Sequence, residues 1–66
     1  MITFCIVYYP DLVQPGAGRT ESDEYGEPIR YGSREHAEAA LRRQYPGKTL
    51  SEIFVHAQKR VESCYC

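Results

Sequence analysis

The run from residue 2 to residue 9 constrains the fold more than any other part of this chain. Apolar or aromatic side chains occupy both of its parities, with Ile2, Phe4, Ile6 and Tyr8 on one and Cys5, Val7 and Tyr9 on the other. Successive side chains of a strand point to opposite faces of a sheet, so both faces of this segment are apolar. The pattern predicts a central strand.

The length limits what can cover that strand. A chain of 66 residues forms one domain and buries about 60% of the surface that it exposes when unfolded. Hydrophobic residues make up 42% and charged residues 26% of the sequence, which is typical of a folded globular domain rather than a disordered tail. We therefore expect a single α+β domain over residues 1–66 with one small core.

The net charge bears on which partner the chain can bind, and the N-terminus and cysteines bear on the cellular compartment in which it works. The formal net charge of -1 demands neither nucleic acid nor a membrane as partner. The N-terminal apolar run lacks a basic segment and is stopped by Pro10 and Asp11, so it is too short for a signal peptide or a membrane span. Cys64 and Cys66 are too close in sequence for a comfortable mutual disulfide. The sequence therefore predicts a cytoplasmic protein with reduced thiols.

The middle of the chain predicts a loop, a short strand and a helix. Residues 10–27 hold glycines, prolines and acids but few apolar anchors, which predicts a long mobile loop. Residues 28–31 offer a short second strand. Ser33 is a suitable N-cap for a helix at 34–45, and Pro46 with Gly47 stops it. The side of this helix expected to be buried carries Ala37, Ala40, Leu41, Gln44 and Tyr45.

The C-terminal third fits two patterns. Residues 49–52 match a capping box, and the apolar residues that follow keep a helical spacing. Ile53 and Val55 are strand formers, however, and a sheet of only two strands is too small to be stable alone. The favoured prediction is two strands at 49–57 and 60–65, which gives a ββαββ-like small antiparallel sheet with one main helix packed on one face; a second helix is the alternative.

The favoured arrangement has a consequence for the opposite sheet face. With one helix as cover, that face would carry Cys5, Val7, Tyr9 and Phe54. Such an apolar face is either covered by the long loop or binds another protein.

Motifs for catalysis or cofactor binding are incomplete. Gly47, Lys48 and Thr49 copy the end of a phosphate-binding loop, but Arg42 stands where the first glycine is needed. A zinc site built from the cysteines and a histidine would lack the paired ligand spacing of structural zinc sites. A cysteine nucleophile would need a base and a dry pocket, for which the chain has little volume. The sequence predicts no catalytic residue, no metal and no cofactor, hence no enzyme.

Charges of opposite sign are separated along the chain. Four acids without an intervening base, Glu21, Asp23, Glu24 and Glu27, precede a basic stretch at residues 30–48. Spaced carboxylates can occupy a basic groove that normally receives nucleic-acid phosphates. Tyr8, Tyr9 and Tyr25 are candidate interface aromatics, because tyrosine buries a large area at low entropic cost. The alternative is a small nucleic-acid-binding regulator that contacts phosphates through Arg34, Arg42 and Arg43.

The layout of a short N-terminal strand, an acidic Gly/Pro loop, a helix ending in Tyr45, Pro46 and Gly47, and a β-rich tail resembles small orphan proteins of phages and mobile elements. Among these, the anti-CRISPR proteins are the functionally best-defined group. The resemblance implies a non-catalytic inhibitor that occupies a nucleic-acid-binding surface of a CRISPR effector subunit. We expect the chain to be a monomer or a homodimer. The expected contacts are the four acids, with Tyr8, Tyr9 and Tyr25.

Overall fold

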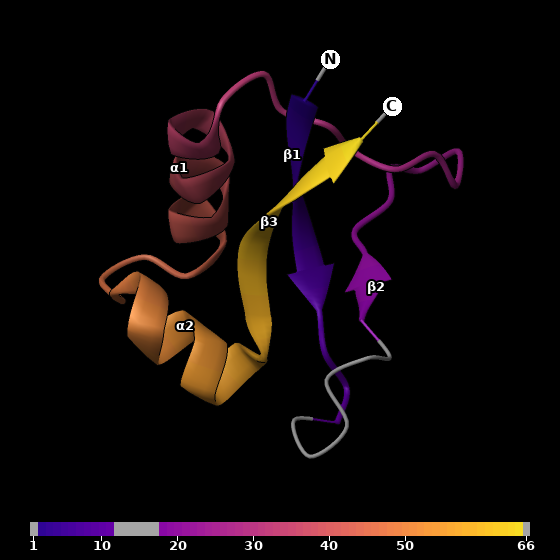
Figure 1. Ribbon diagram of the computed structural model, residues 1–66. Helices are drawn as coiled ribbons and strands as arrows, with labels where there is room; N and C mark the ends of the chain where they lie inside the picture. The colour runs from indigo at the N-terminus through magenta and orange to yellow at the C-terminus, as the bar shows by residue number, and fades with distance from the viewer. Residues whose placement is uncertain (1, 12–17, 66) are drawn as a thin grey trace.

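The computed structural model describes residues 2–11 and 18–65. Within these residues, two helices and three strands follow one another in the order β1 (Ile2–Tyr8), β2 (Arg19–Thr20), α1 (Arg34–Gln44), α2 (Leu50–Ala57) and β3 (Lys59–Tyr65) (Figure 1). The fold is therefore α+β, as predicted.

The sheet is small, open and antiparallel, in the order β2-β1-β3. β1 lies in the centre, which confirms the prediction from its two apolar faces. It pairs with β3 along its whole length, from Ile2 opposite Tyr65 to Tyr8 opposite Lys59. The described ends of the chain therefore meet at one end of the sheet (Figure 1). β3 confirms the strand expected at 60–65 and begins one residue earlier.

Helix α1 forms where its local signals place it. The Ser33 hydroxyl accepts a hydrogen bond from the His36 N–H at 3.1 Å, which satisfies one of the free donors of the first turn. Ala37 and Leu41 are fully buried. Ala40 and Tyr45 are partly buried beside them, whereas Gln44 is exposed. The predicted buried side of this helix is thus confirmed, except at Gln44.

Residues 50–57 form helix α2, so the favoured strand at 49–57 is wrong and the helical alternative is right. The Thr49 hydroxyl accepts from the Glu52 N–H at 3.2 Å, and the Glu52 carboxylate accepts from the Thr49 N–H at 3.1 Å. This reciprocal box satisfies two N-terminal donors. The helical spacing also buries Ile53 in the core. Val55, which favoured a strand, is left 64% exposed.

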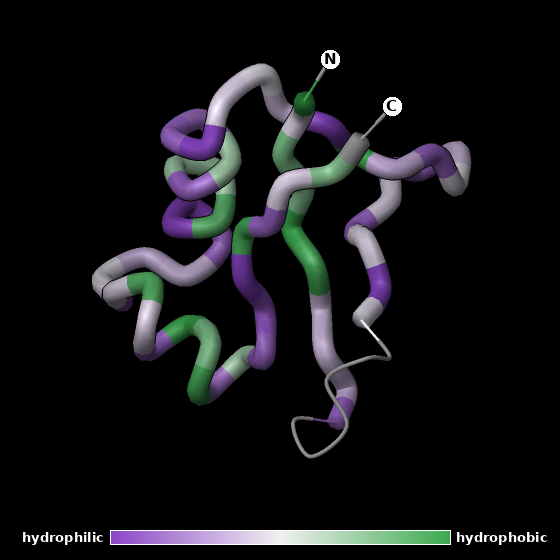
Figure 2. The backbone as a smooth tube through the Cα atoms, viewed as in Figure 1, coloured by the Kyte–Doolittle hydropathy of each residue, from purple (hydrophilic) through white to green (hydrophobic). Residues whose placement is uncertain are grey.

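Both helices cover the face of the sheet that carries Ile6. Ile6, Leu41 and Ile53 form the centre of the core, surrounded by the partly buried residues Tyr31, Ala40, Tyr45, Leu50, Ala57 and Val61. Figure 2 shows the hydrophobic middle of β1 inside this arrangement and the hydrophilic half of β3 next to α2. None of the described helices has both the length and the apolar character needed to cross a membrane.

The opposite face of the sheet is closed rather than open. Cys5 is 2% and Tyr9 is 7% exposed. Phe54 lies on α2, so it does not extend a sheet face as expected; it meets the ring of Tyr9 edge-on, with 6.5 Å between ring centroids. The predicted apolar patch of Cys5, Val7, Tyr9 and Phe54 is therefore not an exposed surface.

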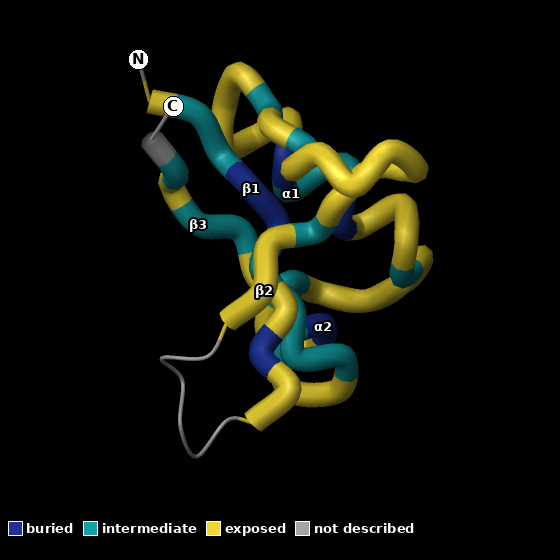
Figure 3. The backbone as a smooth tube through the Cα atoms, turned by 90° about the vertical axis from the view of Figure 1, so that its right-hand side faces the viewer, coloured by how far each residue is buried: buried dark blue, intermediate teal, exposed yellow. Residues whose placement is uncertain are grey.

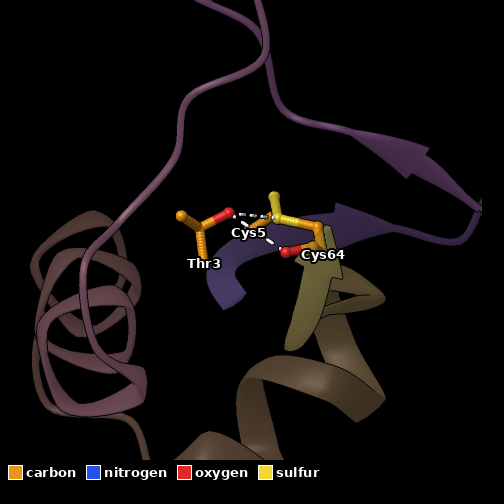
Figure 4. Close-up of a disulfide and its surroundings, with 3 residues drawn as sticks. All are labelled: Thr3, Cys5 and Cys64. Atoms are coloured by element: carbon orange, nitrogen blue, oxygen red, sulfur yellow. Dashed lines mark hydrogen bonds between the residues drawn. A yellow bond between two sulfur atoms is a disulfide. The ribbon is translucent and has the colours of Figure 1, made fainter. Parts of the chain in front are cut away.

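A disulfide between Cys5 and Cys64 lies on this face. The strand register places Cys5 opposite Glu62 and Thr3 opposite Cys64, so the cysteines are diagonal neighbours, with Cα atoms 6.2 Å apart. The Thr3 hydroxyl donates to the Cys64 carbonyl at 3.1 Å (Figure 4). The prediction of reduced thiols is wrong, because it weighed only Cys64 with Cys66. Disulfides persist in oxidising compartments, so this bond does not fit the predicted reducing one.

Candidate functional site

Residues 21–29 form an ordered turn structure, here called the acidic hairpin. The Glu21 N–H donates to the Ile6 carbonyl at 2.9 Å, and the Ile29 N–H donates to the Glu21 carbonyl at 3.0 Å. Nearer the tip, the Asp23 N–H donates to the Glu27 carbonyl at 2.8 Å. Within the segment predicted as a loop, residues 10–27, the structure instead has the strand β2 and this hydrogen-bonded turn. Residues 12–17 lie outside the described part of the chain.

The prediction of a short strand at 28–31 is also wrong, because these residues form only isolated bridges. Pro28 and Tyr31 each form an isolated bridge, to Ser22 and Phe4 respectively. The Tyr31 and Phe4 backbones exchange two hydrogen bonds, of 2.8 and 2.9 Å. This reciprocal pair fixes the exit of the hairpin on β1, while β2 fixes its entry. Both legs of the hairpin thus rest on the central strand.

The tip is held by one of its own acids. The Asp23 Oδ1 atom accepts hydrogen bonds from the N–H groups of Tyr25 and Glu27, each at 2.9 Å. Gly26 adopts a left-handed φ of +81°, which glycine tolerates without steric cost. The Gly26 N–H closes the turn on the Asp23 carbonyl at 3.1 Å. One Asp23 carboxylate oxygen is therefore engaged within the turn, whereas the prediction assigned Asp23 to partner contacts alone.

The base of the hairpin is tied to the helical layer. The Gln44 amide of α1 donates to both carboxylate oxygens of Glu21, at 3.1 and 3.2 Å. Its oxygen accepts from the Lys59 ammonium at 3.3 Å, and that ammonium lies 5.5 Å from the centre of the Tyr45 ring. Glu21 is only partly exposed. This network joins three elements that are far apart in sequence, and sequence patterns gave no signal of it.

The outer part of the hairpin presents free groups to solvent. Tyr25 is 81% exposed, and Glu24 and Glu27 on either side of it are exposed. Figure 3 shows most of the segment between β2 and α1 as exposed. Neither of these two carboxylates bonds to a side chain or backbone group within residues 2–11 and 18–65. The structure thus brings together Glu24, Tyr25 and Glu27 as a compact acidic and aromatic tip.

The other two candidate tyrosines lie elsewhere. Tyr8 is 39% exposed at the end of β1, where it stands opposite Arg19 and Lys59. Tyr9 lies inside the molecule, its hydroxyl bonded to the Glu62 carboxylate and its ring under the Arg60 guanidinium, 5.1 Å from the ring centre. Tyr9 is therefore a packing residue, and only Tyr25 accompanies the acids on the hairpin.

The three arginines proposed to contact nucleic acid, Arg34, Arg42 and Arg43, differ in their contacts within the fold. The Arg34 guanidinium lies over the Phe4 ring, 5.1 Å from its centre, so it is engaged within the fold. Arg42 and Arg43 are exposed in the last turn of α1, where positive charge complements the helix dipole. Neither forms an ion pair with a described residue. All three arginines are exposed, but Arg42 and Arg43 stack on no ring among the described residues, unlike Arg34.

The described residues contain neither a metal-binding cluster nor a cavity. No three histidine, cysteine or acidic side chains among them are grouped so as to hold a metal ion, and no cavity opens between them. The chain matches no protein-family model, no curated protein and no solved structure.

Proposed function

We propose that this chain is a binding protein whose acidic hairpin occupies a basic surface of a partner protein, of the kind that otherwise receives nucleic-acid phosphates. The observation that carries the proposal is the geometry of the tip. Tyr25 stands 81% exposed between two carboxylates that have no bond within the described chain, on a turn whose backbone N–H groups bond to the Asp23 carboxylate.

Rigidity of the tip supports affinity. A segment already held in its bound conformation loses less conformational entropy when it binds. Carboxylates form charge-assisted hydrogen bonds with arginine and lysine, in the way that phosphates do. An exposed tyrosine adds a large contact area with a polar end, which is typical of residues that dominate interface energetics.

The proposed target within this class is a CRISPR effector subunit. It is the target implied by the resemblance to anti-CRISPR proteins, and such effectors hold nucleic acid in positively charged channels. The chain would then inhibit by occupying the channel, without any chemical step. A single small hairpin fits local occupancy of a groove better than mimicry by the whole surface, since the net charge of the chain is only -1.

The test is binding to purified CRISPR effector complexes on a sensor surface, with and without target DNA. The hairpin variant is E24Q/E27Q, which removes two charges and leaves Glu21 and Asp23 to hold the turn. The matched control is E35Q/E38Q on α1, with the same loss of charge. We expect the hairpin variant to bind about tenfold more weakly at low salt, the control to bind as the wild type, and target DNA to compete.

Either of two results would reject the proposal. One is an absence of binding to any effector complex; the other is equal loss of binding in both variants, because this would show a general charge effect rather than contact by the hairpin. A Y25A variant separates the aromatic contribution, with an expected loss of at least about fivefold.

A nucleic-acid-binding regulator is the second candidate, favoured by the accessible Arg42 and Arg43. Its test is retention of duplex DNA or RNA by the isolated chain over a salt series. An R42Q/R43Q variant should then bind more weakly and show a shallower salt dependence, because each phosphate contact contributes to the slope. A chain that retains neither nucleic acid at low salt would reject this candidate.

A further inference from the structure

The backbone groups on the outer edge of β3 have no partner among the described residues, and the hydrogen bonds of β1 define their direction. Phe4 exchanges both of its backbone bonds with Tyr31, and the Ile6 carbonyl accepts from Glu21, so even-numbered residues of β1 face β2. The Tyr9 N–H donates to the Gln58 carbonyl on the other side. Odd-numbered residues of β1 therefore face β3.

The antiparallel register transfers this alternation to β3. Cys5 stands opposite Glu62 and Val7 opposite Arg60, so Arg60 and Glu62 direct their backbone groups toward β1. Lys59, Val61 and Ser63 must then direct theirs outward, because backbone groups alternate along a strand. None of these three makes a backbone hydrogen bond outside the sheet with a described residue.

An edge of this kind can pair with another strand, and the charges on β3 favour a second copy of the same edge. In an antiparallel pair, outward-facing residues stand opposite outward-facing residues. The register centred on Val61 places Val61 opposite its symmetry mate, Lys59 opposite Ser63, and Arg60 opposite Glu62 in both directions. Centring on residue 60 would instead oppose two arginines, and centring on residue 62 would oppose two glutamates.

We propose that this chain forms a symmetric dimer through β3, in the register centred on Val61. The two sheets then form one continuous sheet. Its strand order is β2-β1-β3 in the first copy, followed by β3-β1-β2 in the second. Arg60 and Glu62 already form an ion pair at 2.8 Å within one copy, with side chains 51% and 32% exposed. In the dimer, the same groups meet across the two-fold axis at positions where opposed side chains approach most closely.

Ser63 provides a test that leaves the fold in place, because its side chain is exposed and its backbone faces outward. In the proposed register it stands opposite Lys59 of the second copy. Ser63→Glu therefore adds two symmetric opposite-charge pairs, and Ser63→Lys adds two like-charge pairs. We expect the dimer dissociation constant to fall about fivefold in the first variant and to rise about fivefold in the second.

The measurement is sedimentation equilibrium over a concentration series at low salt, on full chains that also carry Cys66→Ser to exclude disulfide-linked dimers. Urea unfolding of each variant under monomeric conditions checks that the fold is unchanged. A dimer whose dissociation constant moves in opposite directions in the two variants supports the proposal. A chain that stays monomeric up to millimolar concentration, or a dimer that neither variant changes, overturns it.

Discussion

Gly18 shows how a single residue closes the sheet face that lies away from the helices. A Cβ atom built there would lie 2.6 Å from the Cε1 atom of Tyr9 and 2.8 Å from the Cγ1 atom of Val7. The backbone of Gly18 therefore packs directly on both side chains. In the sequence this glycine belongs to a stretch that predicts a flexible loop, because local patterns carry no information on which distant side chain the backbone will approach.

Gly18→Ala should destabilise the fold by about 1–3 kcal/mol, the usual cost of adding a methyl group to a filled site. Gly32→Ala is the control, because no heavy atom lies within 4 Å of the Cβ position there. Urea unfolding midpoints of the two variants measure the difference. Equal midpoints for both variants would show that the contact with Tyr9 and Val7 is not tight.

Gln58 is a second residue whose conformation could not be predicted from the local sequence. The turn before β3 contains no glycine or asparagine, yet Gln58 ends α2 with a left-handed φ of 61°. Its side-chain amide donates to the Tyr9 carbonyl at 2.9 Å and to the Pro10 carbonyl at 3.3 Å. These long-range bonds offset the backbone strain. Glutamine disfavours the left-handed conformation, but here its side chain makes contacts that exist only in the folded chain.

At the element scale, helix α1 could be predicted from sequence and helix α2 only as an alternative. The two helices differ in whether their capping residues and their side-chain propensities favour the same structure. Residues 34–44 combine a cap, helix-favouring residues and a stop, whereas residues 50–57 combine a complete capping box with strand-favouring side chains. The capping box and the burial of Ile53 decided the outcome, in agreement with the rule that tertiary packing overrides propensity.

Thr49→Ala should therefore lower the free energy of unfolding by about 1 kcal/mol, because it removes the side-chain half of the capping box. Ser51→Ala, at an exposed position of the same helix, is the matched control and should change little. Chemical denaturation of the two variants measures both effects. A Thr49→Ala variant as stable as the control would show that the cap does not hold α2.

The same cap predicts a pH dependence. The hydrogen bond with the Thr49 backbone N–H is the main cause that holds the pKa of Glu52 below its ordinary value, and the hydrogen bond with the Thr49 side chain is the second. The folded state therefore favours the charged carboxylate, and the stabilisation is present above the unfolded pKa and lost as pH falls through the folded pKa. Glu52→Gln should show a smaller loss of stability between neutral and acidic pH than the wild type. An identical pH profile would contradict this assignment.

At the scale of the whole molecule, the sheet joins the two ends of the chain. β1 and β3 could each be predicted as strands, but their register, and with it the meeting of Cys5 and Cys64, depends on contacts between distant segments. The order of the acidic hairpin arises in the same way, through Glu21 with Gln44 and Tyr31 with Phe4. Sequence reasoning therefore found the acids of the candidate site but not the framework that presents them.

Reduction of the disulfide should destabilise the molecule strongly. The bond joins residues separated by 59 positions, and closing a loop of that size contributes about 4 kcal/mol in the chain-entropy account. A domain of this length has a total stability of only about 3–10 kcal/mol. Thermal unfolding with and without reductant, together with Cys5→Ser and a Cys66→Ser control, measures the effect. A wild-type chain equally stable in both conditions would show that the bond contributes little.

Backbone ¹⁵N relaxation of the isolated chain measures whether residues 21–29 form a rigid acidic tip rather than a mobile loop. The hydrogen bonds at Glu21, Asp23, Gly26 and Ile29 predict order parameters of about 0.85 through the hairpin, as in the helices. Values below about 0.6 from Ser22 to Pro28 would contradict the account, because a tip without a fixed conformation could not present Glu24, Tyr25 and Glu27 together.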